Sequence, residues 1–585
     1  MLSYVSRWPM ALRVAMSSAI VVLAGLAAGD IGAGLVATLG VFTANYGSDR
    51  PYRNRGAQLA VIAVALAAAV TIGAWAATVT IGVAVVAVSV IAVFAVWLCA
   101  ALSVGPPGAY MFVVVCAAGA GISASHRPAW QIGLLVLAGG AIGWIGQMSG
   151  VLMAPRGPEK AAVAAAGQAV AGYLDTVGTS DSTVARRRAA TALSRAWAVL
   201  VDYQPRSAPG GRLRGLREAN HALHVLFTDA MTAVGQGRAV SADAAAIARA
   251  IATEELDPGV VANRDPGRAP LRRPPTMTLL NRAIRPGAQT RRVMTRVGIA
   301  APVAGGAAGM LGMGHVYWAM AAAVLMLHQG AHRAATVKRG AQRVLGTVVG
   351  LGLAAAILSA HPQGLWLVLV VAALQFAIEL VVVRNYGLAT VFITGIALTI
   401  AAAGGRTDVG VLMLDRGADT AIGCGVGLAV YLLAVRRQEA HRIDESVVSA
   451  LEGTIAATRF LARGDADSLA SRAARRDLQD RIFDLAEAEE AARHGSGRDR
   501  AAAARLAPIV AATEHLGYAT VAACWDAEQR GDSVFGTADP ESYLDVLQEI
   551  SESARTSTVP PVAEELPPFA APEVRLLSRA LSERR

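Results

Sequence analysis

The sequence predicts an all-α polytopic membrane protein with two parallel six-helix transmembrane repeats, each followed by a cytoplasmic helical domain. Three observations lead to this fold class. The chain of 585 residues is 54% hydrophobic and only 16% charged, which is too apolar for a set of soluble domains. The charges are clustered, so that Arg127 is the only charged residue between Arg55 and Arg156. The two apolar blocks also share sequence at equivalent positions.

The uncharged gaps of the first block give a count of membrane crossings, because a helix needs about 20 apolar residues to span the hydrocarbon core. The gap from Arg13 to Arg50, which contains Asp30 and has Asp49 at its end, fits two crossings that turn at Gly29-Asp30. The gap from Arg55 to Arg127 fits three crossings, and the gap from Arg127 to Arg156 fits one. Glycine, proline and spacing place the two breaks within the set of three near Ala76-Ala77 and at Gly105-Pro106-Pro107-Gly108.

The second block follows the same arithmetic and also gives six crossings. Two fit between Arg296 and Arg333 with a turn at Gly312 to Gly314, and two fit between Arg343 and Arg384 with a turn at His361-Pro362. One more fits between Arg384 and Arg406, and the last is predicted over Gly417 to Val435. The total is therefore about twelve transmembrane helices.

Positive charges set the predicted orientation, since Lys and Arg concentrate in cytoplasmic loops. The formal net charge of +10 therefore marks the cytoplasmic side and does not require nucleic acid. Both termini are predicted in the cytoplasm of a multi-pass protein of the cell (inner) membrane. On this count the loops that follow the second and eighth helices are cytoplasmic, and Arg127, Arg406 and Arg416 are on the outer side.

An internal repeat relates the two blocks. Arg55-Gly56-Ala57-Gln58 recurs as Arg339-Gly340-Ala341-Gln342, 284 residues later, in the same loop of the predicted topology. An even number of helices in each copy makes the copies enter the membrane in the same direction, which predicts a pseudo-twofold axis along the membrane normal.

Two polar, alanine-rich segments follow the blocks. The first contains four helix candidates and ends in a basic, proline-rich linker that we expect near the anionic inner leaflet. The second contains four long helix candidates and a short one that begins at Pro572. The predicted domains are a first transmembrane block (1–154), a cytoplasmic helical domain with its linker (155–295), a second transmembrane block (296–437) and a C-terminal cytoplasmic helical domain (438–585).

Catalytic and nucleotide-binding motifs are missing from the sequence. It has no GxxxxGK followed by Ser or Thr, no GxSxG and no HExxH, so that neither an ATP-driven pump nor a hydrolase of these types is indicated. We expect no enzyme activity, no cofactor, no metal and no nucleic-acid partner. The expected partners are the lipid bilayer and a small organic anion, while homo-oligomerisation and a periplasmic adaptor are left open.

Polar residues in or near the predicted helices are the candidates for function, because a charge within the membrane is costly and is usually retained for a reason. Asp30, Glu379 and Asp419 are candidate coupling carboxylates, with a snorkelling or Arg384-paired Glu379 and a helix-capping Asp419 as equally acceptable structural readings. Candidates for a solute path are Asn45, Tyr46, Tyr317, Trp318, His328 and Gln329, which could equally serve helix packing. Candidates for a cytoplasmic mouth that attracts anions are Arg50, Arg53, Arg55, Arg333, Arg339 and Arg343, which could equally be topology markers.

Several segments resemble the fusaric acid resistance family of aromatic acid exporters. They are Arg7–Arg13 (RWPMALR), Lys338–Gly350 (KRGAQRVLGTVVG), Asn385–Thr394 (NYGLATVFIT) and Asp419–Gly423 (DTAIG). The resemblance covers the second block well, whereas the first block matches mainly by topology. It implies two six-helix halves around a central path in a transporter that expels aromatic carboxylic acids or other toxic compounds.

Three functions are compatible with these features. The leading hypothesis is an inner-membrane exporter of aromatic or amphipathic organic anions, driven by the proton gradient or the membrane potential. A passive organic-anion channel is the second, and a membrane scaffold whose cytoplasmic helices bind a partner is the third.

Overall fold

The computed structural model is helical throughout the part of the chain that it describes. It describes residues 8–122, 127–179, 181–204, 211, 213–235, 237–261, 271–286, 288–328, 333–403, 409–434, 439–530, 534–560 and 565–584. Within these ranges all regular elements are helices and no strand occurs, which confirms the all-α class.

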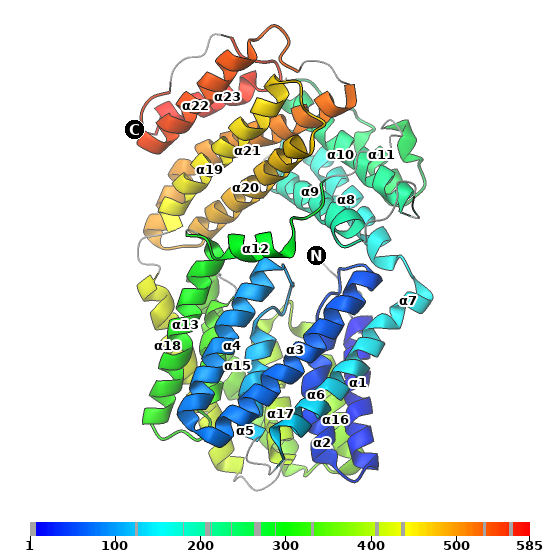
Figure 1. The fold of residues 1–585 in the computed structure, drawn as a ribbon, viewed down its shortest axis with the longest axis vertical. Coiled ribbons are helices and arrows are strands. Elements are labelled where there is room, and N and C mark those ends of the chain that lie inside the picture. Colours follow the sequence, from blue (N-terminus) through cyan, green and yellow to red (C-terminus); the bar gives the residue numbers. More distant parts are fainter. Residues whose placement is uncertain are drawn as a thin grey trace. The chain divides into compact units, whose positions relative to one another are not determined.

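The chain divides into two compact units (Figure 1). The membrane unit consists of Met1–Ser48, Tyr52–Pro155 and Pro274–Arg436. The polar unit consists of Asp49–Pro51, Arg156–Arg273 and Arg437–Arg585. Each unit therefore combines segments that are far apart in the sequence.

Six apolar helices form the first part of the membrane unit. They are α1 (Trp8–Ala27), α2 (Ile31–Val41, continued by a 3-10 turn over Phe42–Asn45), α3 (Tyr52–Val79), α4 (Ile81–Ala101), α5 (Tyr110–Ile122) and α6 (Ala129–Met148), followed by the single turn α7 (Gly150–Met153). Asp30 begins α2 by accepting a hydrogen bond from the amide of Ala33 at 3.0 Å. The break predicted near Ala76-Ala77 is wrong, because the chain breaks at Thr80, whose hydroxyl caps α4.

The second part of the membrane unit begins with a short helix that the sequence analysis did not predict. The helices are α12 (Thr276–Ala283), α13 (Gln289–Met310), α14 (Val316–Leu327), α15 (Arg333–Ser359), α16 (Gly364–Val381), α17 (Tyr386–Ala403) and α18 (Val409–Ala434). The prediction that the last helix starts at Gly417 is wrong. Helix α18 begins at Val409, so that Asp419 lies in its interior and does not cap it.

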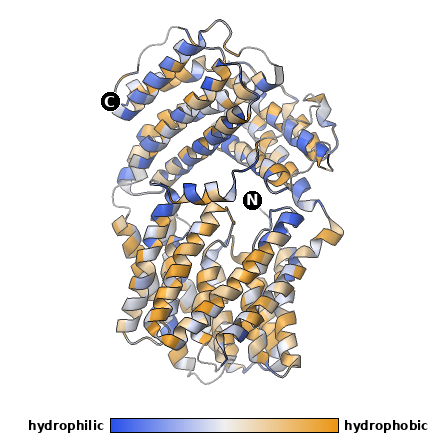
Figure 2. Cartoon of the chain, viewed as in Figure 1, coloured by the Kyte–Doolittle hydropathy of each residue, from blue (hydrophilic) through white to orange (hydrophobic). Residues whose placement is uncertain are grey.

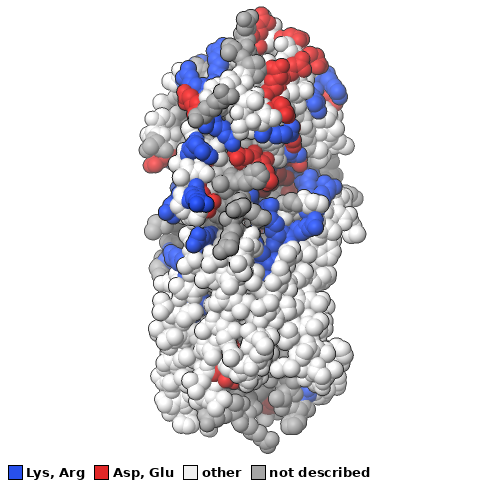
Figure 3. Space-filling view, turned by 90° about the vertical axis from the view of Figure 1, so that its left-hand side faces the viewer, with Lys and Arg blue, Asp and Glu red and all other residues white. Residues whose placement is uncertain are grey.

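Several of these helices have the composition of membrane spans. Seven of the described helices are long and apolar enough to cross a membrane: α1, α3, α4, α6 with α7, α15, α16 and α18. The helices α2, α5, α14 and α17 are apolar but shorter. Figure 2 shows the apolar residues concentrated along the helices of this unit, and the face in Figure 3 has a broad uncharged surface over them. These features support membrane localisation.

Glycines allow very close helix contacts in the membrane unit. A Cβ atom on Gly139 of α6 would lie 1.8 Å from the carbonyl oxygen of Ala37 in α2. A Cβ atom on Gly423 of α18 would lie 2.1 Å from the carbonyl oxygen of Ala319 in α14. Only glycine fits at such distances, as is common where membrane helices cross closely. Between the two blocks, α1 packs on α16 and α4 packs on α13.

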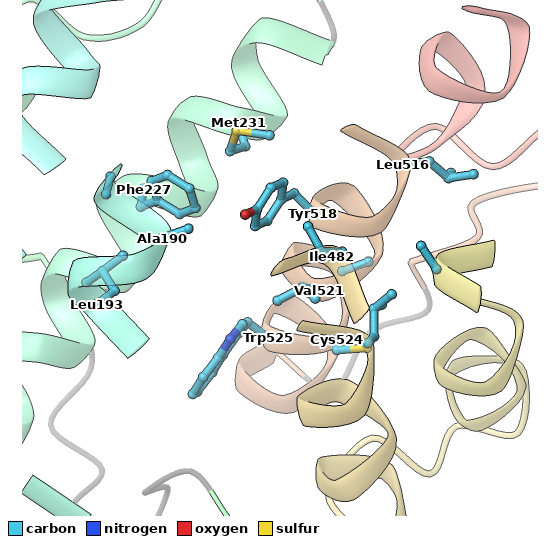
Figure 4. Close-up of a cluster of buried hydrophobic side chains, with 14 of the residues drawn as sticks. Ala190, Leu193, Phe227, Met231, Ile482, Leu516, Tyr518, Val521, Cys524 and Trp525 are labelled. Atoms are coloured by element: carbon cyan, nitrogen blue, oxygen red, sulfur yellow. The ribbon is translucent and has the colours of Figure 1, made fainter. Parts of the chain in front are cut away.

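The polar unit is a helical assembly with one shared core. Its helices are α8 (Gly157–Thr176), α9 (Ser182–Trp197), α10 (Arg214–Gly235), α11 (Ala244–Ala252), α19 (Glu439–Ala462), α20 (Leu469–Arg493), α21 (Gly497–Arg530), α22 (Pro540–Thr556) and α23 (Ala571–Ser582). Side chains of α10, such as Phe227 and Met231, face Tyr518 of α21 in the interior (Figure 4). The segments that follow the two membrane blocks therefore fold together.

Buried ion pairs also join the two segments of the polar unit. Arg186 of α9 contacts Glu514 of α21 at 3.0 Å, and their side chains are 3% and 0% exposed. Arg187 contacts the same carboxylate at 2.8 Å and Glu489 of α20 at 2.5 Å. Burial lowers the pKa of His224 in the same core to about 3, so that this imidazole is neutral in the folded unit.

Candidate functional site

Two of the three buried arginines in the described part of the membrane unit lie in its second block. Arg343 of α15 is 2% exposed and donates a hydrogen bond from Nη1 to the hydroxyl of Tyr386, the first residue of α17, at 3.2 Å. This pair of helices packs closely because Gly346 lies against the backbone of Gly387, where a Cβ atom would come within 2.5 Å of the carbonyl oxygen. The Nε atom of Arg343 has no hydrogen-bond partner among the described residues, so that part of its donor capacity is unused.

Arg416 of α18 is the second buried arginine. It is 4% exposed, and its guanidinium carbon lies 4.0 Å from the ring centroid of Trp318. A desolvated cation over a tryptophan face is stabilised by about 2 kcal/mol. Helix α15, which carries Arg343, packs against α18, and Arg416 interacts electrostatically with Arg343, Tyr110 and Tyr386.

Asp419 is the acidic member of this group. Its side chain is fully buried one turn after Arg416 on α18, and the two interact electrostatically. Neither carboxylate oxygen of Asp419 has a hydrogen-bond partner in the described part of the chain. With both guanidinium groups charged, the group has a formal charge of +2 when Asp419 is neutral and +1 when it is ionised, so that an additional anion would reduce the buried charge in either state.

Aromatic residues complete the group. Tyr110 of α5 comes from the first block, and its ring stacks against that of His328 with centroids 5.8 Å apart. Trp318 also lies next to Tyr317, whose centroid is 5.9 Å away. We define the arginine cluster as Arg343, Arg416, Asp419, Tyr386, Tyr110 and Trp318.

A partly exposed contact between a histidine and an aspartate lies near Asp419. His315, which precedes α14, contacts Asp415 of α18 at 3.0 Å, and the side chains are 25% and 18% exposed. Asp415 is one helical turn before Asp419. Tyr317 interacts electrostatically with both carboxylates, which connects this pair to the arginine cluster.

The predicted path residues of the first block lie outside the arginine cluster. Tyr46 is fully buried and donates a hydrogen bond to the carbonyl oxygen of Gly108 at 2.7 Å. Asn45 ends the 3-10 turn after α2, and its Oδ1 atom has no described hydrogen-bond partner. The Tyr46 contact is that of a packing residue.

The predicted path residues of the second block lie at or beside the cluster. Trp318 stacks on Arg416, and Tyr317 is its neighbour on α14. His328 contacts Tyr110 at the other end of α14. Gln329 falls outside the described residues.

The six arginines predicted as a cytoplasmic mouth differ in exposure. Arg53 and Arg333 are exposed, and Arg339 is partly buried. Arg50 belongs to the polar unit, where it lies 4.4 Å over the ring of Tyr203. Arg55 and Arg343 are 4% and 2% exposed, so that these two side chains lie in the interior and not at a surface. Arg55 instead donates to the carbonyl oxygen of Ser48.

The three candidate carboxylates have different surroundings. Asp30 caps α2 and pairs with Arg127 at 2.6 Å, where the side chains are 45% and 28% exposed. Glu379 is 5% exposed and accepts a hydrogen bond from Gln375 at 3.3 Å. Asp419 is fully buried and interacts electrostatically with Arg416 inside the arginine cluster.

Sequence reasoning missed Arg416, Tyr386 and Tyr110 as site residues. Arg416 was assigned to the outer side because charges were taken to mark loops. The spacing Asp415, Arg416 and Asp419 was the available signal, since these positions share one helix face when the helix begins upstream of them. The tyrosines each stand at the first position of an apolar helix, where they look like interfacial residues.

Comparison with known proteins supports the resemblance found in the sequence. Residues 303–430 match a family described as "Fusaric acid resistance protein-like". The chain is 27% identical over 590 aligned residues, 94% of its length, to "Uncharacterized membrane protein YvaC" of Bacillus subtilis (strain 168), of which 90% is covered. No solved structure matches the chain. The residues that match the family, 303–430, include five of the six members of the arginine cluster.

Proposed function

We propose that this protein is a membrane transporter that exports amphipathic organic anions, aromatic carboxylates among them. The observation that carries the proposal is the arginine cluster. Arg343 and Arg416 are almost fully buried in an apolar helical unit, and ionisable residues in such places mark solute or ion pathways. The family match in the same block is consistent with a transport role.

The chemistry of the cluster suits an anion with an apolar ring. Guanidinium groups form bidentate hydrogen bonds to carboxylates, and these are stronger in a desolvated site. The faces of Trp318 and Tyr110 lie beside these groups and could contact a ring. A solute that lacks the charge would leave the guanidinium donors unpaired, and this difference would favour anions over neutral aromatics.

The proposed architecture is two parallel six-helix repeats with both termini in the cytoplasm of the inner membrane. The glycine contacts support the duplication, because Gly139 against Ala37 in the first block corresponds to Gly423 against Ala319 in the second. The helix contacts agree with the duplication as well. The first helix of each block packs on the fourth helix of the other block, α1 on α16 and α13 on α4. The four predicted domains are part of this proposal.

Electrostatic capture and coupling belong to the same proposal. The more exposed arginines Arg53, Arg333 and Arg339 would raise the local anion concentration at the cytoplasmic side. An inside-negative membrane potential favours outward movement of an anion by about 2.3 kcal/mol per 100 mV. Asp419 is the preferred coupling carboxylate, ahead of Asp30 and Glu379, because it interacts with Arg416 inside the cluster.

The test is flux of radiolabelled benzoate through proteoliposomes that contain the full-length protein. Arg343→Gln and Arg416→Gln should each lower flux at subsaturating benzoate roughly 100-fold, because each leaves less positive charge for the carboxylate. Arg285→Gln is the matched control, since Arg285 is an exposed arginine of the membrane unit outside the cluster, and it should keep wild-type flux. Equal flux in all four proteins would overturn the assignment of the site.

The alternatives give different results in the same assay. A passive channel would show flux that follows an imposed voltage and is unaffected by a proton gradient. A scaffold would show no flux of any organic acid, while deletion of its gene would alter the assembly of a membrane complex.

A further inference from the structure

We infer that each chain holds one anion site, in the second membrane block, and that the first block is its apolar counterpart. This inference rests on the proposed function and concerns how the duplicated unit is used. It follows from comparing the arginine cluster, position by position, with the equivalent part of the first block.

The position of Arg343 is fixed by the repeated tetrapeptide. Arg339-Gly340-Ala341-Gln342 corresponds to Arg55-Gly56-Ala57-Gln58, and the next residue is Arg343 in one copy and Leu59 in the other. Both side chains are buried, at 2% and 0% exposure. The same interior position therefore holds a cation in α15 and an aliphatic side chain in α3.

The position of Arg416 is fixed by glycines that make equivalent contacts. Gly139 and Gly143 of α6 lie against backbone oxygens of α2, at 1.8 and 3.3 Å from an added Cβ atom. Gly423 and Gly427 of α18 lie against backbone oxygens of α14, at 2.1 and 3.1 Å. Both pairs differ by the same 284 residues as the tetrapeptide, so that Arg416 corresponds to Ile132.

The remaining charged and aromatic positions follow from the same registers. Asp419 corresponds to Leu135 in α6, and the α14 to α2 register set by Ala319 and Ala37 pairs Trp318 with Val36. Leu59, Ile132 and Val36 belong to one buried hydrophobic cluster, against which Leu135 packs. An anion there would meet none of the donors present in the second block, and burial without such donors costs several kcal/mol.

Each block contributes a tyrosine to the site. Tyr110 and Tyr386 are the first residues of α5 and α17, the corresponding helices of the two blocks. Both interact electrostatically with Arg343 and Arg416. The first block therefore contributes Tyr110 to the site of the second block. The region of the first block that corresponds to this site is filled by aliphatic side chains.

The experiment is the binding stoichiometry of benzoate with the purified full-length protein, measured by equilibrium dialysis. The wild-type chain should bind one benzoate. The double variant Arg343→Leu with Arg416→Ile gives the second block the residues of the first, and it should lose binding by at least 100-fold. Its folding is verified by thermal denaturation, because replacing buried charges by apolar residues of similar size is often neutral or stabilising.

Two further variants make the result specific. Arg343→Lys with Arg416→Lys keeps both charges and should retain weakened binding of one benzoate. Leu59→Met with Ile132→Val changes the first block conservatively and should bind within about twofold of wild type. Two benzoates per wild-type chain would overturn the inference and leave the proposed function standing. Wild-type affinity in the folded Leu/Ile variant would overturn both the inference and the assignment of the arginine cluster as the site. No binding to the wild-type chain would overturn the proposed function itself.

Discussion

Glu514 is the carboxylate that joins α9 to α21 in the polar unit, and Glu514→Gln tests whether buried ion pairs hold the two segments together. The glutamine has nearly the same size, so that the change removes charge and leaves packing intact. Arg187 would keep Glu489 as a partner at 2.5 Å. Arg186, which is 3% exposed and pairs with Glu514, would become a buried cation without its carboxylate. Breaking a buried pair in this way costs about 3–5 kcal/mol.

Cys524 provides an assay for this cost within the intact protein. Its side chain is 1% exposed in α21, and burial raises the pKa of its thiol to about 11, so that it reacts with thiol reagents only when the polar unit opens. The other three cysteines, Cys99, Cys116 and Cys424, are first replaced by alanine. A cost of about 3–5 kcal/mol should then raise the labelling rate of Cys524 between roughly a hundred-fold and several thousand-fold.

The matched control is an exposed ion pair of the same unit. Glu254 contacts Lys160 at 2.9 Å with side chains that are 54% and 56% exposed. Glu254→Gln should cost less than about 1 kcal/mol and change the labelling rate less than about fivefold. Equal labelling rates for the two variants would refute the conclusion that the buried pair holds α9 and α21 together.

Three further outcomes follow from the structure. Gly423→Ala should lower the thermal midpoint in detergent by several degrees or prevent accumulation of the protein in the membrane, because its Cβ atom would lie 2.1 Å from a backbone oxygen of α14. Gly425→Ala is the control, since a Cβ atom there has open space, and it should behave as wild type. The folded unit keeps His224 neutral down to pH about 3, so that the unfolded chain binds one more proton than the folded chain at this residue below pH 6.5. The free energy of unfolding should therefore fall by about 1.4 kcal/mol per pH unit as the pH decreases. His224→Gln should reduce that slope in thermal melts between pH 7 and 5, and an unchanged slope would contradict the burial of a neutral His224. Glu379→Gln should leave proton-driven benzoate uptake into inverted vesicles intact while Asp419→Asn abolishes it, and the reverse pattern would move the coupling role to Glu379.

The helix breaks that could be predicted from the sequence are those with a local chemical cause. Gly29-Asp30, Gly312 to Gly314 and His361-Pro362 all lie between helices, because glycine, proline and a capping carboxylate each disfavour continuous helix. The break at Thr80 has only a hydroxyl cap between two apolar runs, and such a cap does not stand out from the surrounding sequence.

The method that located the helices from the sequence could not locate the arginine cluster. Counting uncharged gaps assumes that charged residues lie outside the helices. The assumption holds for Arg127 and Arg384 and fails for Arg416, whose cost of burial is offset by Trp318 and by nearby tyrosines in other helices. These contacts depend on tertiary packing, which spacing along one helix does not reveal.

The shared core of the polar unit sets an order of events during synthesis. Phe227 and Met231 are packed against α21 in the folded protein, yet α21 is translated only after the whole second membrane block. At roughly 5–20 residues per second, the intervening stretch of nearly 300 residues keeps this apolar surface waiting for about 15–60 s. The nascent chain must therefore hold a half-formed core while the apolar helices α13 to α18 are translated, and a chaperone or the ribosome surface has that interval in which to shield it.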